Sequence, residues 1–289
     1  MRIAVLSSPS SWHYRDLSRA GGPHNIVALP FSQISSFVSG KTIEVRSGEV
    51  ELSQFDGVLV RTMPPGSLEQ IVFRMDALDQ LATNGVPVIN PPRAIEIAVD
   101  KFLSAACLHR ANIKVPESST CQSVGEAMEA FEAFGRDVVL KPIFGSEGRG
   151  ITRITDEAIA LRGFKLLVQT GAVIHMQRFI THRGSDIRVL VIGDSVFGMR
   201  RINDSDWRTN VSRGARTEPI NVDDDLAESA IQAARSVKAS LAGIDFLTDE
   251  NGTRFCLEVN AVPGWKALSR TLNIDVASQV IEHILQSAQ

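Results

Sequence analysis

The 289-residue chain contains little cysteine and no long hydrophobic run. Its three cysteines lie far apart without a Cys-x-x-Cys pair, so neither a disulfide framework nor a zinc site is indicated, and we expect a cytoplasmic protein. No apolar stretch approaches the roughly 20 residues of a membrane-spanning helix. The net charge of −3 favours neither nucleic-acid nor membrane binding. The 44% of hydrophobic residues is ordinary for a globular protein with a sizeable core.

Lysine is scarce as well, with 7 lysines against 23 arginines. The planar donor fork of arginine suits carboxylates and phosphates. Residues 178–216 contain eight arginines and four aspartates but neither lysine nor glutamate, a net charge of +4. A basic segment in a mildly acidic protein favours a pocket for anions, although a solvated basic face would have the same composition.

Short apolar runs at residues 2–6, 57–61 and 86–90 predict buried strands. After the second run, apolar residues from Leu68 onward follow helical spacing until an Asn-Gly pair ends the helix. Strands that alternate with helices predict a parallel α/β sheet for residues 1–93, and the Pro-Pro pair after the third run marks a domain boundary.

The most informative segment is a predicted β-hairpin. An Asn-Gly pair between two apolar runs, here Asn251-Gly252, is the strongest short-range hairpin signal. With this pair at the centre of the turn, counting back along both strands places Asp245 directly opposite Glu258, with Cβ atoms about 4.5–5.5 Å apart. Asn260, two residues further, projects from the same face. The other face is apolar and should pack into the core: Ile244, Phe246, Phe255, Leu257 and Val259.

Asp245, Glu258 and Asn260 together form a cluster of oxygen ligands. Two carboxylates that face each other repel, so a positive charge is needed between them. Carboxylate and amide oxygens suit Mg²⁺ or Mn²⁺, and Mg²⁺ completes its shell with waters and substrate phosphates. The cluster therefore favours a metal site beside a nucleotide. A solvent-facing hairpin whose acids are neutralised by arginines, or an acid–base carboxylate pair, would use the same residues.

A glycine-rich loop follows the predicted strand 138–142. Its three glycines would let backbone N–H groups approach a phosphate closely, although it is neither a P-loop nor a dinucleotide fingerprint and a plain flexible loop is the alternative. The loop consists of Gly145, Ser146, Glu147, Gly148, Arg149 and Gly150. Lys141 ends the strand before it, and Lys101 lies near a helix start after Asp100. Both lysines suit phosphate, unless they only add solubility at the surface.

A further polar group lies between the loop and the hairpin. Asp186 and Arg188 share one face of a strand-like run, and Arg208, Asn210 and Arg213 follow in a polar stretch. Arginine forks and an amide suit a substrate carboxylate or an acyl phosphate. Ordinary surface salt bridges are the competing interpretation.

In this order the pieces resemble the ATP-grasp superfamily, and more closely its RimK-like α-L-glutamate ligase branch. The match covers essentially the whole chain and is strongest over residues 101–264. Each motif is weak alone, but the ordered set is specific: Asp100-Lys101, Lys141-Pro142 with the glycine loop, Gln177-Arg178-Phe179-Ile180, Asp186-Ile187-Arg188, Arg208-Thr209-Asn210, Arg213-Gly214, Asp245, Glu258-Val259-Asn260 and Pro263-Gly264.

The resemblance implies a mixed α/β and α+β fold and a role for each part. Residues 1–93 would form an N-terminal α/β domain, residues 94–175 a central lid subdomain of the ATP-grasp fold, and residues 176–289 a C-terminal core with the metal-binding hairpin. ATP would lie between the last two parts. The loop 145–150 would close over its phosphates.

The resemblance also implies roles for single residues. Lys101 and Lys141 would contact the phosphates, and Asp186 would belong to the nucleotide-binding set. The backbone of a hinge would recognise adenine: Gln177, Arg178, Phe179 and Ile180. One or two Mg²⁺ or Mn²⁺ ions would be held by Asp245, Glu258 and Asn260. The acyl phosphate and substrate carboxylates would be bound by Arg188, Arg208, Asn210 and Arg213.

The chain departs from the family's pattern at two places. The acidic residue that often follows the hinge and holds the ribose is absent from Thr181-His182-Arg183, which leaves the ribose contact unassigned. Ser212 stands where the branch commonly has a histidine. The segments 11–15 and 61–66 look more like a subgroup that acts on one-carbon cofactors of the tetrahydromethanopterin and methanofuran type.

The implied reaction has two steps. A substrate carboxylate attacks the γ-phosphate of ATP, which gives ADP and an acyl phosphate, and an amine, expected to be that of glutamate, then displaces phosphate to form an amide. The acceptor would be a small cofactor such as a pterin or furan, or a protein C-terminus. A phosphotransferase and a non-catalytic nucleotide-binding regulator are the rival functions. A homo-oligomer, dimer or tetramer, is expected, without nucleic-acid or membrane partners.

Overall fold

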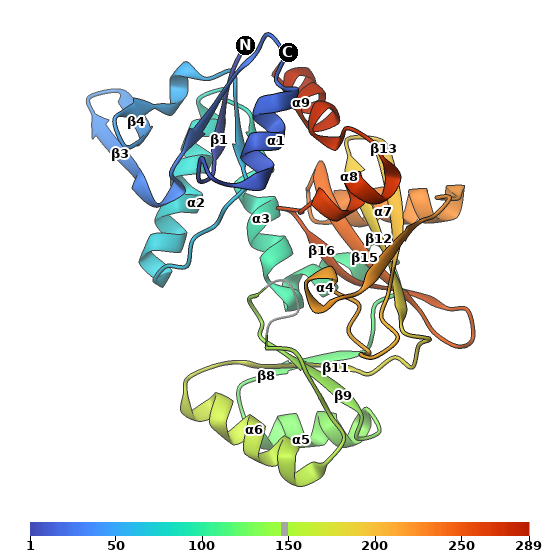
Figure 1. Cartoon of the computed structure of the whole chain (residues 1–289). Coiled ribbons are helices and arrows are strands. Elements are labelled where there is room, and N and C mark those ends of the chain that lie inside the picture. The colour runs from blue at the N-terminus through green and yellow to red at the C-terminus, as the bar shows by residue number, and fades with distance from the viewer. Residues whose placement is uncertain (146–149, 289) are drawn as a thin grey trace.

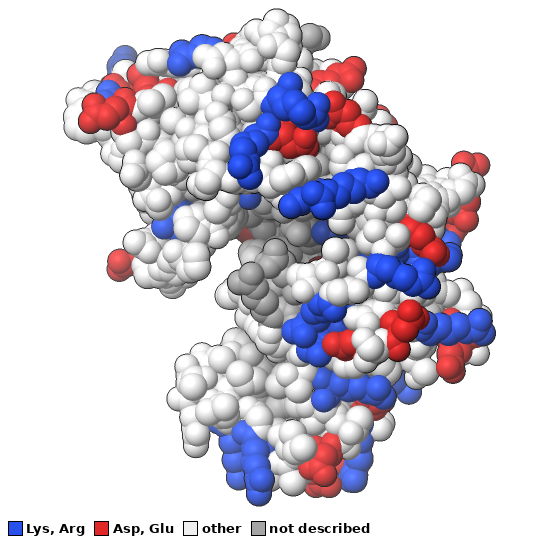
Figure 2. Space-filling model, viewed as in Figure 1, with Lys and Arg blue, Asp and Glu red and all other residues white. Residues whose placement is uncertain are grey.

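The computed structural model describes residues 1–145 and 150–288 (Figure 1). Ser146, Glu147, Gly148 and Arg149 of the glycine loop therefore lie outside the described residues. The chain forms an N-terminal part and a C-terminal core that lie side by side, and a central subdomain below them in the view of Figure 1. The space-filling view shows this face of the molecule hollowed between the upper parts and the central subdomain (Figure 2).

The N-terminal part is built on a parallel sheet of strand order β2-β1-β6-β7, as the sequence predicts. Ala4 and Leu6 of β1 pack with the helix α2 on one face, while Ile3 and Val5 pack with α1 and α9 on the other. The bounds of this part are β1 (Arg2–Leu6), α1 (Trp12–Ala20), β2 (Asn25–Leu29), β6 (Gly57–Val60), α2 (Leu68–Thr83) and β7 (Val88–Ile89).

A second, antiparallel sheet in the N-terminal part has no counterpart in the sequence prediction. It consists of β3 (Ile34–Ser39), β4 (Thr42–Ser47) and β5 (Val50–Glu51). Most of β3 is exposed, so the strand lacks the buried apolar run by which the other strands are recognised.

The central subdomain is an antiparallel sheet of order β10-β9-β11-β8 with the helices α5 and α6 packed against it (Figure 1). It has a hydrophobic cluster of its own around the fully buried Phe131 and Phe164. Its elements are β8 (Ser118–Cys121), α5 (Val124–Ala133), β9 (Val138–Lys141), β10 (Thr152–Ile154), α6 (Glu157–Gln169) and β11 (Ile174–Arg178).

The C-terminal core is a five-stranded antiparallel sheet of order β14-β13-β12-β15-β16. Its strands are β12 (Ser185–Ile192), β13 (Ser195–Ile202), β14 (Arg216–Pro219), β15 (Leu241–Thr248) and β16 (Arg254–Asn260). The helices that pack on it are α3 (Pro92–Val99), α4 (Lys101–Arg110), α7 (Asp224–Ser236), α8 (Lys266–Leu272) and α9 (Val276–Ser287). None of the described helices could cross a membrane, because none is both long and apolar enough.

Asn90, directly after β7, fastens the N-terminal part to the core. Its amide nitrogen donates to the carbonyl oxygens of Leu241 and Ala261 at 2.7 and 2.6 Å, and its amide oxygen accepts from the backbone N–H groups of Ser240 and Leu241. The hydrophobic clusters of the two parts are also continuous, since Ala4 and Ala242 belong to one cluster.

The domain boundaries expected from the sequence stay a prediction, and the packing suggests a refinement. The strand β11 crosses the 175/176 boundary and pairs only within the central sheet, while α3 and α4 pack on β16 of the core. We propose that the central subdomain spans residues 118–178 and that residues 92–117 belong to the core.

The hairpin of β15 and β16 places Asp245 directly opposite Glu258, as predicted, but by a different route. The turn is one residue longer than expected, because Thr248 pairs with Arg254 and Gly252 takes the left-handed conformation at φ +82°. A β-bulge next to Asp245 then adds one residue to β16 and restores the register.

Because of the bulge, the prediction that one face of β16 is entirely apolar and buried is partly wrong. Cys256, 1% exposed, lies opposite Phe246 in the core. Leu257, the extra residue of the bulge, instead lines a cavity on the other side of the sheet, and Phe255 is only half-buried. An extra residue in a strand reverses the side to which the following side chains point.

Candidate functional site

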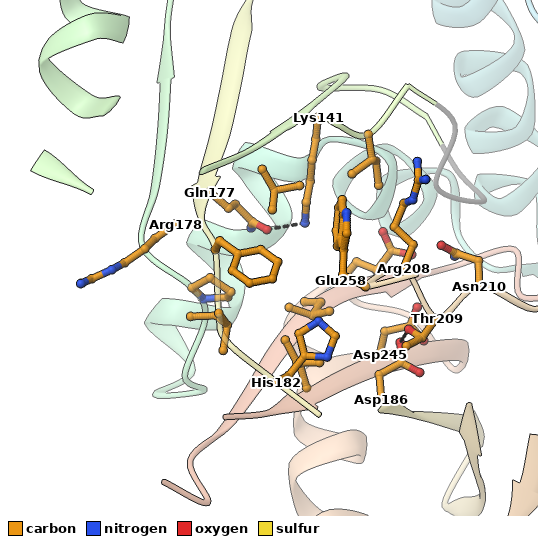
Figure 3. Close-up of a pocket in the computed structure, with 18 of the residues that line it drawn as sticks. Lys141, Gln177, Arg178, His182, Asp186, Arg208, Thr209, Asn210, Asp245 and Glu258 are labelled. Carbon is orange, nitrogen blue, oxygen red and sulfur yellow. Dashed lines mark hydrogen bonds between the residues drawn. The ribbon is translucent and has the colours of Figure 1, made fainter. Parts of the chain in front are cut away.

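A cavity of about 740 Å³, open to solvent, lies between the central sheet and the core sheet (Figure 3). It is apolar where the hinge enters it and charged where β12, β13, β15 and β16 meet. Its lining residues are Pro116, Val139, Lys141, Ile151, Gln177, Arg178, Phe179, Ile180, His182, Asp186, Arg201, Trp207, Arg208, Thr209, Asn210, Asp245, Leu247, Leu257 and Glu258.

Three aromatic side chains gather at the apolar end. The ring of Phe179 lies 5.8 Å from that of Trp207, edge to face, and 5.9 Å from the imidazole of His182. The Nδ1 atom of His182 is buried and has no hydrogen-bond partner among the described residues. Burial, and then the positive charge of Arg153, lower the pKa of His182, so the imidazole is neutral at pH 7. This end of the cavity suits a flat heterocycle that carries a polar substituent.

The hinge residues predicted from the sequence all line this cavity. The side chain of Arg178 points away from it (Figure 3) and pairs with Glu117 at 2.7 Å, so Arg178 contributes backbone only. The N–H groups of Arg178 and Phe179 already donate to the carbonyl oxygens of Glu117 and Asp137. Within the described residues, the N–H group of Ile180 makes no such backbone bond.

Lys141 and Lys101 are two positively charged side chains near the start of the glycine loop. Lys141 donates to Oε1 of Gln177 inside the cavity (Figure 3). Removal from water lowers the pKa of Lys141 to about 8, although Glu258 opposes this shift. Lys101 donates to the carbonyl oxygen of Gly145 at 3.0 Å, and burial likewise lowers its pKa. Lys101, Gly145 and Gly150 do not line the cavity.

A row of alternating charges begins on the floor of the cavity, which Asp186, Arg201 and Asp245 line, and ends at Arg188, which lies outside the lining. Arg201 donates to Asp186 at 2.7 Å and to Asp245 at 3.0 Å, and Arg188 donates to Asp245 at 2.6 Å. All four side chains are at most 12% exposed. Although burial acts in the opposite direction, Arg188 and Arg201 hold the pKa of Asp245 below its ordinary value. Thr209 adds a hydrogen bond to Asp186.

These pairs bear on the predicted metal ligands. No group of three or more His, Cys, Asp or Glu side chains that could hold an ion occurs in the described part of the chain. Each carboxylate oxygen of Asp245 accepts one hydrogen bond from an arginine and keeps a further lone pair. The alternative in which arginines neutralise the hairpin acids therefore accounts for the charge of this residue. Glu258 makes no ion pair with a described residue, and Oδ1 of Asn260, which accepts from the N–H of Val262 at 2.9 Å, keeps one lone pair.

The donor set therefore fits a Mg²⁺ ion in part. Glu258 and Asn260 offer one carboxylate and one amide oxygen, and Mg²⁺ is commonly held by one or two carboxylates plus substrate phosphates and waters. Asp245 could join them through the lone pair that each of its oxygens keeps beside the hydrogen bond from Arg188 or Arg201. Asn260 lies opposite Gly243 at the end of β16 and outside the cavity lining.

Of the other residues predicted to bind the acyl phosphate, two line the cavity and one does not. Arg208 and Asn210 line the cavity, where Arg208 is paired with Asp206 at 2.7 Å. Arg213 is exposed and lies outside the lining, so its role stays a prediction. Other arginines of the basic segment form exposed salt bridges, such as Arg200 with Glu218, and acids and bases are interspersed on the face shown in Figure 2.

Arg201, Trp207 and His182 line the cavity but are missing from the predicted set. A signal for Arg201 exists in the sequence. Gly193-Asp194 forms the turn between β12 and β13, and counting back from it places Arg201 directly opposite Asp186. The same reasoning that located the Asp245–Glu258 pair would therefore have found this arginine.

The sequence model of a protein family, the RimK-like ATP-grasp domain, matches residues 98–284 of the chain. The chain belongs to the RimK-like ATP-grasp family. It is 31% identical to the tetrahydromethanopterin:α-L-glutamate ligase of Methanosarcina acetivorans, over 97% of each protein. It is also 31% identical to the glutamate–LysW ligase ArgX of Sulfurisphaera tokodaii, over 82% of this chain and 84% of that protein.

Solved structures show the same fold. A RimK domain ATP-grasp protein of Sphaerobacter thermophilus superimposes with a TM-score of 0.76 at 22% identity, covering 99% of this chain and 100% of the other. The ATP-grasp ligase PsnB, complexed with a minimal precursor, Mg and ADP, has a TM-score of 0.77 at 19% identity, covering 99% and 97%. These comparisons confirm the predicted fold and the prediction of an ATP-grasp ligase of the glutamate-ligase branch.

Proposed function

We propose that this ATP-grasp ligase uses ATP and Mg²⁺ to join the amine of L-glutamate to a carboxylate of a small acidic cofactor. The observation that carries the proposal is the cavity, which combines an aromatic, apolar end with Lys141, Glu258, Arg201 and Arg208 at the other end. The names of the relatives supply the amino acid and the class of acceptor, including one protein acceptor, LysW.

The apolar end is proposed as the adenine and ribose site. Phe179 and Trp207 would contact the base, and the free N–H group of Ile180 would donate to a ring nitrogen. The orphaned Nδ1 of His182 would hydrogen-bond to a ribose hydroxyl, which replaces the acidic residue that the sequence lacks after the hinge. A buried polar atom without a partner is costly, so a ligand that supplies the partner binds more tightly.

The charged end is proposed as the site of phosphoryl transfer. Lys141 and Lys101 would neutralise the phosphates, and Glu258 and Asn260 would hold one Mg²⁺. A second ion would need Asp245 as a further ligand. The bound Mg²⁺ supplies charge neutralisation to the phosphate oxygens. The acceptor carboxylate attacks the γ-phosphorus, the bond to ADP breaks, and an acyl phosphate forms. Arg208 and Asn210 orient it while the glutamate amine attacks the acyl carbon, loses a proton and expels inorganic phosphate.

The test is release of ADP from ATP and Mg²⁺ with glutamate and a panel of acidic cofactors and peptides, followed by mass spectrometry. A product heavier by one glutamyl residue supports the proposal. A phosphorylated product without an amide would identify a phosphotransferase and overturn it, as would nucleotide binding without turnover across the whole panel. The expected cytoplasmic location and homo-oligomeric state stay predictions.

A further inference from the structure

The side chain of Arg61 is buried and makes no hydrogen bond with another described residue. It follows β6 directly and is 9% exposed. Its Nε and Nη1 atoms are buried, and neither has a hydrogen-bond partner among the described residues. The guanidinium lies over the ring of Trp265, with Cζ 4.4 Å from the ring centroid. This stacking accounts for the face of the group but leaves its in-plane donors unused.

Apart from Asp16, the described groups at this site are positive or neutral. His13, in the first turn of α1, accepts from the backbone N–H of Trp265 at 3.3 Å. Burial, and then the charges of Arg61 and Lys266, lower the pKa of His13 to about 3, so it adds no charge at pH 7. Lys266 lies 5.6 Å from the ring of Trp12 on the same side. The nearest acid on α1, Asp16, is occupied by Arg19 and by Nε1 of Trp265.

The helix α1 adds to this positive field. Its N-cap residue, Ser11, makes no side-chain capping bond, and its first turn contains no acidic residue. Helix N-terminal N–H groups attract anions, and in a parallel α/β sheet ligands bind at the carboxyl ends of the strands, where the β1–α1 and β6–α2 connections meet. An unpaired buried charge is strongly destabilising, so the arrangement calls for a bound anion.

The site is close to the proposed reaction centre. Trp265 follows Asn260 by five residues, and because neighbouring Cα atoms are 3.8 Å apart, the two Cα atoms lie within about 19 Å of each other. A single molecule of cofactor size can therefore reach from one site to the other. The site joins the N-terminal part to the core, with Arg61 from the first and Trp265 from the second.

We propose that Arg61, the first turn of α1 and Lys266 bind a second oxyanion of the acceptor, a carboxylate or a phosphate, remote from the carboxylate that reacts. The identification of the ligand as the acceptor rests on the proposed ligase function. Binding of an anion at this site does not require turnover. We expect substrates of this enzyme to carry an acidic group at one end in addition to the carboxylate that is activated.

The first test measures anion binding without catalysis. The protein is saturated with Mg²⁺ and ADP to block the cavity, and its melting temperature is measured with succinate or with inorganic phosphate, at ionic strength held constant with chloride. We expect at least one of these probes to raise the melting temperature of the wild type and of Arg162→Ala, a control at an exposed arginine on α6. Arg61→Met should abolish the rise, and Lys266→Ala should reduce it. The probe that acts identifies the anion as carboxylate or phosphate.

Two results would overturn the site. One is a wild type that responds to neither probe, and the other is an equal response in Arg61→Met. If Arg61→Met does not fold, Arg61→Lys replaces it, which keeps the charge but loses the fork and should weaken probe binding about tenfold or more.

The second test assigns the site to the acceptor. Once the panel of acceptors has yielded a substrate, Arg61→Met should raise the KM for that acceptor about tenfold or more and leave the KM for ATP unchanged. A rise in the KM for glutamate instead would assign the anion to the amine donor and contradict the proposal. If no acceptor is turned over, the ligase function fails while the melting experiment still decides the anion site.

Discussion

Arg188 on β12 lies directly opposite Asp245 on β15, and its Nη1 donates to Oδ1 at 2.6 Å. The guanidinium reaches this position by lying over Gly243, where a Cβ atom would come within 2.8 Å of its Cζ and Nε atoms. Glycine at 243 is thus a condition for the Arg188–Asp245 pair, because any larger residue would displace the guanidinium.

Gly243→Ala should therefore break the pair and leave Asp245 to Arg201 alone. We expect a loss of about 1–3 kcal/mol in the free energy of unfolding, measured with urea, since the added methyl overpacks a buried site. Ligase activity should fall at least tenfold. Gly163→Ala is the matched control, because Gly163 lies in α6, where an added Cβ would meet no atom within 4 Å, and the change should gain about 0.5–1 kcal/mol. Equal effects at the two glycines would contradict the packing argument.

Glu258→Gln should abolish amide formation while the protein still folds. The change removes the carboxylate of the Asp245–Glu258 pair that no described arginine or lysine pairs with, and with it the strongest proposed ligand of Mg²⁺. Activity should fall more than a hundredfold, measured as ADP release, with an unchanged circular dichroism spectrum. Glu250→Gln, in the exposed turn of the same hairpin, serves as the control. Full turnover by Glu258→Gln would refute the metal assignment.

Activity should also depend on the protonation of Lys141. Its pKa of about 8 lies below the ordinary 10.5, and the protonated form is the one that attracts phosphate. The kcat/KM for ATP should therefore fall as the pH rises through about 8. Lys141→Arg, which stays charged, should move this decline to higher pH, whereas Lys165→Arg on α6 should leave it in place. An identical pH profile in Lys141→Arg would assign the decline to another group.

The lowered pKa of Lys141 also affects stability, and here the effect increases with pH, whereas activity falls. Between about pH 8 and 10.5 the unfolded chain binds more protons at Lys141 than the folded protein does. The contribution of this residue to the free energy of unfolding should therefore increase with pH in that window. Lys141→Met should remove this increase in urea titrations at several pH values.

His182→Ala should weaken ATP binding through the ribose. We expect the KM for ATP to rise about tenfold, and the preference of the wild type for ATP over 2′-deoxy- or 3′-deoxy-ATP to disappear for one of these analogues. His109→Ala, an exposed histidine on α4, is the control. If His182→Ala weakens ATP and both analogues by the same factor, the imidazole contacts another part of the nucleotide.

The hairpin shows what local patterns can and cannot predict. The pairing of Asp245 with Glu258 was accessible because a turn and strand alternation fix register over a few residues. The prediction nevertheless missed the longer turn and the bulge, which cancel at this pair but not at Leu257. A bulge depends on how the sheet packs and bends, and a single sequence contains little trace of it.

Local sequence patterns could not predict which residues pair with each charged side chain. That Asp245 faces the cavity follows from alternation, but that Arg188 and Arg201 bond to both of its oxygens depends on the order of β13, β12 and β15 in the sheet. The environment of Arg61 was equally hidden, since Trp265 follows it by about 200 residues and meets it only when the two parts dock.

Asn90 shows how closely these parts depend on each other. Its amide has two donors and two acceptor lone pairs, and all four are spent on main-chain atoms of residues 240, 241 and 261. A fragment that lacks the N-terminal part would leave these four main-chain groups without their side-chain partner and would uncover the apolar surface around them. This enzyme should therefore resist modular engineering: its first ninety residues cannot be exchanged for those of another ligase unless an equivalent side chain arrives with them.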